Sequence, residues 1–160
     1  VKVDIPAGAA DGNYMTLQGQ GHAGPRGGPA GDVLVIIQEE KHPYFDRQDA
    51  DVLYELPISF SQAVLGDRTE IPTLTGKVRL TIPEGTQSGK VFRLRGKGLP
   101  HLNGYGQGDQ LVKITVWTPI NLSDKEKNLF RELAQLDGGK APKHDKGFFD
   151  RLKEDLGFGE

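Results

Sequence analysis

The sequence contains one unit twice. Ile5-Pro6-Ala7-Gly8 recurs as Ile82-Pro83-Glu84-Gly85, at an offset of 77 residues (82 − 5). Because apolar strand positions match at this offset as well as turn glycines, a duplicated supersecondary unit explains the pattern better than chance. The further matches, with no gap, are Gly12 with Gly89, Leu17 with Leu94, Gly19 with Gly96, Gly21 with Gly98, Gly31-Asp32 with Gly108-Asp109, and Leu34, Val35 and Ile37 with Leu111, Val112 and Ile114.

Each copy has the pattern of short strands joined by tight turns. After the Ile-Pro-x-Gly turn come a strand (14–18; 91–95), a glycine-rich loop and another strand (33–38; 111–117). Phe92 and Leu94 alternate with Arg93 and Arg95, as in a strand with one covered face. The chain also holds 22 glycines and 10 prolines in 160 residues. These features predict a mostly β body.

The stretch between the copies predicts the front half of the second unit. Residues 52–56 and 69–73 have strand composition, and 61–65 predict a short helical turn. The matching front half of the first unit is then expected about 35 residues upstream of Val1. The first domain is therefore expected to be incomplete, and the chain to be a piece of something longer. Alternation of Val1, Val3 and Ile5 with polar residues predicts an opening strand.

From Leu122 onward the pattern becomes helical. Ser123 and Glu126 have capping-box spacing, and the apolar positions that follow, Leu129, Phe130, Leu133 and Leu136, form a stripe. A polar linker (140–146) separates this stripe from a shorter one: Phe148, Phe149, Leu152 and Leu156. The first stripe is equally compatible with packing on its own domain and with a seam between two copies.

Several function classes are disfavoured by composition. The chain has no cysteine, which excludes disulfides and thiolate zinc sites. Its four histidines are scattered, so no metal site is expected. No constellation of base and nucleophile is present, and we expect no enzyme and no catalytic residue. Apolar runs are far shorter than the roughly 20 residues of a membrane span.

A basic stretch around the second copy leaves one alternative open. A net charge of −2 selects no partner, but Arg79, Arg93 and Arg95 could form a basic face on a β-sandwich module that binds a ligand or nucleic acid. The competing explanation is that these arginines lie on the solvent-exposed face of a sheet whose other face is packed. Aromatic residues are not interleaved among these bases, so no nucleic-acid partner is expected.

Taken in order, motifs along almost the whole chain resemble the C-terminal region of bacterial DnaJ co-chaperones. No single motif is specific, but their combination is. The motifs are Ile5-Pro-Ala-Gly, Gly31-Asp32, Lys41-His42-Pro43-Tyr44-Phe45, Leu56-Pro57-Ile58, Ala63-Val64-Leu65-Gly66, Ile71-Pro72-Thr73-Leu74, Gly76-Lys77-Val78, Arg95-Gly96-Lys97-Gly98 and Gly147-Phe148-Phe149.

The resemblance implies two consecutive, similar β-sandwich-like domains followed by amphipathic C-terminal helices. Its boundaries are 1–43 for the remaining part of a substrate-binding domain I, 44–120 for domain II, and 121–160 for a dimerisation helix and tail. It implies that unfolded polypeptide docks as an extended strand in a shallow apolar groove, with Val1, Val3 and Phe45 at groove positions. It also implies a homodimer through Leu129, Phe130, Leu133 and Leu136.

The resemblance is partial. His42-Pro43 is followed by Tyr44 instead of the aspartate of the family's J-domain signature, and the cysteine repeats that hold zinc are missing. This chain is therefore expected to carry no cofactor. Zinc is expected only in the cysteine-rich region, which this chain lacks. Partnership with a DnaK-type ATPase is expected through the full-length protein, in the cytoplasm, with no membrane contact.

Overall fold

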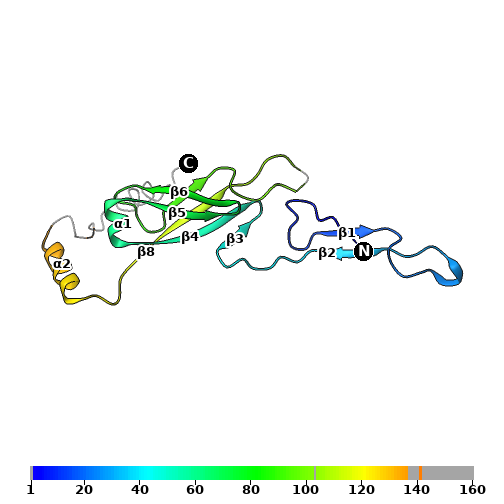
Figure 1. Cartoon of the computed structure of the whole chain (residues 1–160), viewed down its shortest axis with the longest axis horizontal. Coiled ribbons are helices and arrows are strands. Elements are labelled where there is room, and N and C mark those ends of the chain that lie inside the picture. The colour runs from blue at the N-terminus through cyan, green and yellow to red at the C-terminus, as the bar shows by residue number, and fades with distance from the viewer. Residues whose placement is uncertain (1, 103, 137–140, 142–160) are drawn as a thin grey trace, which may run out of the picture. The chain divides into compact units, whose positions relative to one another are not determined.

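The computed structural model describes residues 2–102, 104–136 and 141. The protein is mostly β, as the sequence predicts, with one amphipathic helix near the end of the described part (Figure 1). The second apolar stripe, 148–156, lies outside the described residues. The elements are β1 (Tyr14–Leu17), a 3₁₀ turn (Pro25–Gly27), β2 (Val33–Ile36), β3 (Phe45–Gln48), β4 (Asp51–Ser59), α1 (Phe60–Leu65), β5 (Asp67–Thr73), β6 (Gly76–Ile82), β7 (Val91–Leu94), β8 (Gln110–Trp117) and α2 (Asp124–Gln135).

The duplication is confirmed by hydrogen bonds that recur at the 77-residue offset. Gly12 N–H donates to the Ile37 carbonyl at 3.0 Å, and Gly89 N–H donates to the Ile114 carbonyl at 2.8 Å. Two further pairs of bonds match: Gly21 to Gly31 with Gly98 to Gly108, and Gly31 to His22 with Gly108 to Leu99. The two copies therefore share backbone geometry around the glycine-rich loop.

Glycine is required where this loop begins. Gly19 and Gly96 occupy matching positions and have φ angles of 66° and 64°, a region that costs side-chain-bearing residues free energy. Each amide then donates to an aspartate carboxylate: Gly19 to Asp32 at 2.9 Å and Gly96 to Asp109 at 2.8 Å. The Gly-Asp motif thus closes the loop in both copies.

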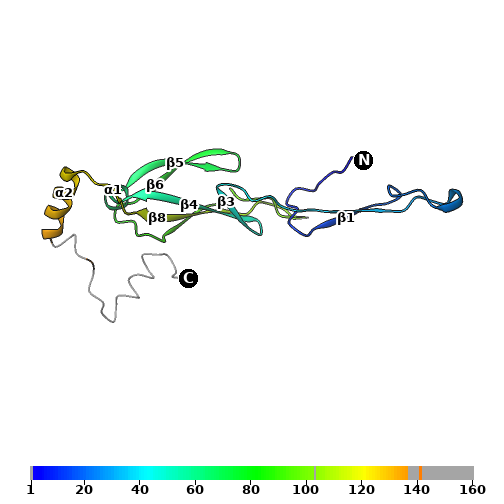
Figure 2. The same cartoon turned by 90° about the horizontal axis from the view of Figure 1, so that it is seen from below.

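The strands form three antiparallel groups. β1 pairs with β2, β5 pairs with β6, and a four-stranded sheet has the order β3-β4-β8-β7. The β5–β6 hairpin lies beside β4 (Figures 1 and 2). By spatial contacts the chain divides into one unit of 1–54 with 93–111 and another of 55–92 with 112–160.

The spatial unit formed by 55–92 and 112–160 contains most of the buried core. β8 is flanked by β4 and β7, and its Val112 and Ile114 are fully buried. The matching positions of the first copy, Val35 and Ile37, are only half-buried, because β2 belongs to a two-stranded sheet in the described part of the chain. The other core side chains of the second unit are Leu56, Ile58, Ala63, Ile71, Leu80 and Ile82.

Helix α1 is held at both ends. At its start, Gln62 N–H donates to Ser59 Oγ, and Ser59 N–H donates back to Gln62 Oε1, so two free amides are paired. At its end, the amides of Gly85 and Thr86 donate to the carbonyls of Val64 and Ala63 at 3.1 and 3.0 Å. The Ile-Pro-x-Gly turn of the second copy therefore anchors this short helix.

The prediction of a strand at residues 1–5 is wrong for residues 2–5, the part that the structure describes. Residues 2–5 belong to no strand. An extended segment stays a strand only where a neighbour pairs its amides and carbonyls, and alternation of side chains alone does not supply that neighbour. The other predicted strands form, although β2 ends at Ile36 instead of Gln38.

In the described part of the chain, neither helix combines the length and the hydropathy that a membrane crossing requires.

Candidate interaction surfaces

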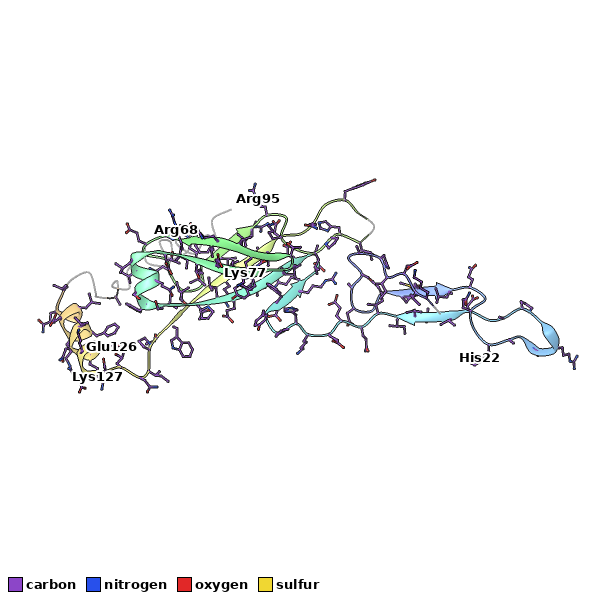
Figure 3. The ribbon with its side chains drawn as sticks, in the orientation of Figure 1. His22, Arg68, Lys77, Arg95, Glu126 and Lys127 are labelled. Carbon is purple, nitrogen blue, oxygen red and sulfur yellow. The ribbon has the colours of Figure 1, made fainter. Side chains whose placement is uncertain are left out.

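Helix α2 begins with the capping box that the sequence predicts. Glu126 N–H donates to Ser123 Oγ at 3.3 Å, and the Glu126 carboxylate accepts from the Ser123 amide at 2.7 Å and from its hydroxyl at 2.6 Å. These bonds, the side-chain one first, lower the pKa of Glu126. The carboxylate in the first turn also interacts favourably with the positive end of the helix dipole. Figure 3 labels Glu126 and Lys127 on this helix.

The apolar stripe of α2 is largely uncovered. No residue of the helix is buried, and the four predicted interface side chains have exposed fractions between 39% for Phe130 and 62% for Leu136. A helix of 12 residues is marginal in water unless an apolar face is packed. This face therefore has the exposure expected of a surface that takes a partner.

The stripe shares a groove with α1. The Phe60 ring meets the Phe130 ring nearly edge-on, with centroids 6.2 Å apart and an interplanar angle of 72°. The cavity beside this contact has a volume of about 610 Å³. Ser59, Ser61, Asn121 and Glu126 contribute polar atoms. We call it the α1–α2 groove; its apolar lining is Phe60, Val64, Leu65, Trp117, Pro119, Leu122, Leu129, Phe130 and Leu133.

A second apolar surface lies on the β1–β2 sheet. Tyr14 is opposite Ile36, and Thr16 is opposite Leu34, so these four side chains share one face. Tyr14, Leu34 and Ile36 have exposed fractions of 72%, 58% and 63%. The position of the second copy that matches Ile36 holds Lys113, also exposed. The first copy therefore has an isoleucine on this exposed face where the second copy has a lysine.

The predicted groove residues are only partly described. Val1 lies outside the described residues, and Val3 is half-buried in a segment without regular structure. Phe45 belongs to β3 and is 9% exposed, because its ring packs against His42 and Tyr54 with centroids 5.0 and 5.7 Å away. Their role in a shared groove stays a prediction.

One interaction was missed by sequence reasoning. Arg47 of β3 donates to the carbonyls of Gly8 and Ala9 at 3.0 and 2.8 Å, and it forms an ion pair with Glu39. It also donates to the Asp49 carbonyl. This Arg47 clamp ties the β3–β4 hairpin to the Ile-Pro-Ala-Gly turn of the first copy. Nothing in the local sequence marks this arginine, since its partners lie up to 39 residues away.

The comparisons with known proteins agree with this architecture. Residues 1–119 match the model of the DnaJ C terminal domain, and residues 125–154 match that of the chaperone protein DnaJ C-terminal region. The chain belongs to the DnaJ C-terminal domain family. The predicted resemblance is thereby confirmed.

The relatives of this DnaJ C-terminal chain are bacterial. A chaperone protein DnaJ from Ruminiclostridium cellulolyticum is 51% identical over 154 residues, which cover 96% of this chain and 41% of the relative. The chaperone proteins DnaJ of Shouchella clausii and Halothermothrix orenii are 49% and 45% identical, over 96% and 99% of this chain. The chain thus spans about two fifths of the length of these relatives.

The predicted basic residues of this DnaJ C-terminal chain do not share one strand. Arg79 is exposed on β6 opposite Glu70, whereas Arg93 forms a 3.1 Å ion pair with Asp109. Arg68 and Lys77 also belong to the β5–β6 hairpin and are labelled in Figure 3 with Arg95. Among the described residues no group of histidine and carboxylate side chains could hold a metal ion. These observations give the nucleic-acid alternative no added support.

Proposed function

We propose that this chain is the client-holding and self-pairing part of a DnaJ-type co-chaperone, with no catalytic step and no zinc of its own. Membership of the DnaJ C-terminal domain family supports the co-chaperone role. The chain spans about two fifths of the length of its relatives. For the longer protein we propose that it cooperates with a DnaK-type ATPase in the cytoplasm, and that any bound zinc lies outside this chain.

The open apolar face of the β1–β2 sheet is the observation that carries client binding. An extended, unfolded segment would add to a strand edge through backbone hydrogen bonds, which do not depend on client sequence. Bulky client side chains would then contact Tyr14, Leu34 and Ile36. Val1, Val3 and Phe45 are proposed to complete the groove. A surface of this kind seldom stays exposed without a partner.

The exposed stripe of α2 supports self-pairing. In a dimer, Leu129, Phe130, Leu133 and Leu136 of the two copies would form an apolar seam. Two arms could then engage one client, and linking them raises the overall avidity by roughly a hundredfold or more where both can bind. Modest affinity at each arm is sufficient for such a chaperone.

The client surface is tested by Ile36→Lys, which gives the first copy the charge that Lys113 places at the matching position. We expect the affinity for a reduced, unfolded model protein to fall about tenfold or more, because a large apolar contact is lost. Thr81→Lys, on the exposed face of β6, is the matched control. Equal aggregation suppression by wild type and Ile36→Lys would falsify this assignment.

Phe45→Ala tests the predicted groove separately. Because Phe45 packs inside the β3–β4 hairpin, circular dichroism must first show that the variant is folded. If the folded variant suppresses aggregation as well as the wild type does, Phe45 is not part of the client site.

A further inference from the structure

The proposed pairing uses the apolar stripe of α2, but it gives no contact to the α1 wall of the groove or to the second apolar stripe of the sequence. The groove is an apolar cavity of about 610 Å³, within the usual volume range of ligand pockets. The stripe is Phe148, Phe149, Leu152 and Leu156, interspersed with five charged residues at 150, 151, 153, 154 and 155. Its spacing predicts one apolar face and one charged face.

We infer that segment 148–156 occupies the α1–α2 groove of its own chain. The tail would cover the apolar side chains of α1 and α2 and keep its charged face in water. A second copy would then meet α2 and the docked tail together, so the proposed pairing seam is wider than the four α2 residues. The inference concerns the same helix as that pairing and does not require it.

The length of the intervening chain permits this return. Phe148 follows Leu136 by twelve positions (148 − 136), and an extended chain over twelve positions reaches roughly 40 Å. Helix α2 has 12 residues and is about 18 Å long. Gly138-Gly139 can reverse the chain direction without steric cost. The tail therefore reaches any point along the groove.

Tethering favours the chain's own tail over other occupants. A segment tethered by a short linker has an effective concentration on the order of millimolar at its own site. A client or the tail of a second copy, at micromolar concentration, must compete with it. A segment that covers the groove would also stabilise α2, because a 12-residue helix is marginal in water unless its apolar face is packed.

Trp117 provides a direct reporter from inside the groove. It is the single tryptophan of the chain, it lines the groove, and it is 59% exposed in the described part of the chain. In the full chain we expect its emission at shorter wavelength and weak quenching by acrylamide. Phe148→Asp/Phe149→Asp should shift the emission to longer wavelength and increase the quenching. Phe158→Asp, in the same tail but outside the stripe, should leave both unchanged.

Limited trypsin digestion reports the tail itself, at Arg151 and Lys153. We expect cleavage there to accelerate about tenfold or more in two full-chain variants, because proteolysis follows the undocked population. One is Phe148→Asp/Phe149→Asp. The other is Leu65→Asp, which changes the groove wall at a side chain that is 75% exposed, so the fold should survive. Phe158→Asp is again the control.

Three results would overturn the inference. Equal Trp117 quenching in all variants means that the tail does not cover the groove. Tail cleavage unaffected by Leu65→Asp means that the tail docks elsewhere or nowhere. Loss of Trp117 protection on dilution, in step with loss of dimer mass in light scattering, means that the occupant comes from a second copy. Trp117 protection that persists after dilution to the monomer would support docking of the tail on its own chain.

Discussion

The amide N–H of Gly96 donates a 2.8 Å hydrogen bond to the Asp109 carboxylate, and this bond is the main cause that lowers the pKa of Asp109. Partial desolvation opposes the effect, and the Arg93 guanidinium adds to it. Gly19 and Asp32 form the same bond in the first copy. An aspartate therefore anchors the glycine-rich loop in each copy.

Asp109→Asn should destabilise the protein at neutral pH, and the difference should vanish in acid. Because the folded-state pKa of Asp109 is depressed, its carboxylate stabilises the fold above the unfolded pKa of about 3.9. That contribution is lost as the pH falls through the folded pKa. Urea midpoints measured across this range should converge, with Asp46→Asn on β3 as the control. A gap that stays constant with pH would contradict the assignment.

Arg47→Ala should loosen the turn of the first copy. The guanidinium pairs with the carbonyls of Gly8 and Ala9 and with Glu39. Losing these bonds should cost about 1.5–3 kcal/mol of unfolding free energy, the usual range for hydrogen bonds to a charged group. Hydrogen exchange should accelerate at residues 8–9 and 39. Arg131→Ala removes an arginine bonded to Asn128 and should leave these amides protected; similar exchange in both variants would count against the clamp.

Ser123→Ala should fray the start of α2. The variant loses the hydroxyl that accepts from Glu126 N–H, and loss of such a cap costs about 1 kcal/mol. Hydrogen exchange in residues 124–127 should rise. Ser88→Ala, which removes a hydroxyl bonded to the Val116 amide, is a control expected to leave α2 unchanged. Unaltered exchange in Ser123→Ala would show that packing alone holds the helix start.

Leu129→Asp/Leu133→Asp should convert the proposed dimer to a monomer. Each charge placed in an apolar seam costs several kcal/mol, so the dimer dissociation constant should rise at least a hundredfold. Light scattering gives the mass. Asn128→Asp adds a charge to the same helix outside the stripe and should remain dimeric. An unchanged mass in the double variant would exclude the helix as the interface.

Salt separates client capture from the rival basic face. Apolar capture of an unfolded protein should change little between low and physiological ionic strength, whereas phosphate binding weakens steeply. Arg79→Glu should therefore leave aggregation suppression intact. Tight, salt-sensitive binding of an oligonucleotide that this variant abolishes would favour the nucleic-acid alternative.

Features that depend on neighbouring residues were predictable from the sequence. The Ile-Pro-x-Gly turns, the glycine-rich loops and the Ser123–Glu126 capping box use partners within a few residues or recur in a repeat, so their geometry follows from local steric and hydrogen-bonding rules. The opening strand was predicted wrongly over residues 2–5 for the same reason: alternation is local, but a strand requires a distant neighbour.

What only the tertiary structure decided depends on residues far apart in the chain. Matching positions of the two copies have different burial, with Val112 fully covered and Val35 half-covered, because only β8 has strands on both sides. The Arg47 clamp and the α1–α2 groove likewise join segments 38 or more residues apart. A local pattern records what a residue prefers, whereas burial and long-range bonds depend on which other segment is brought against it.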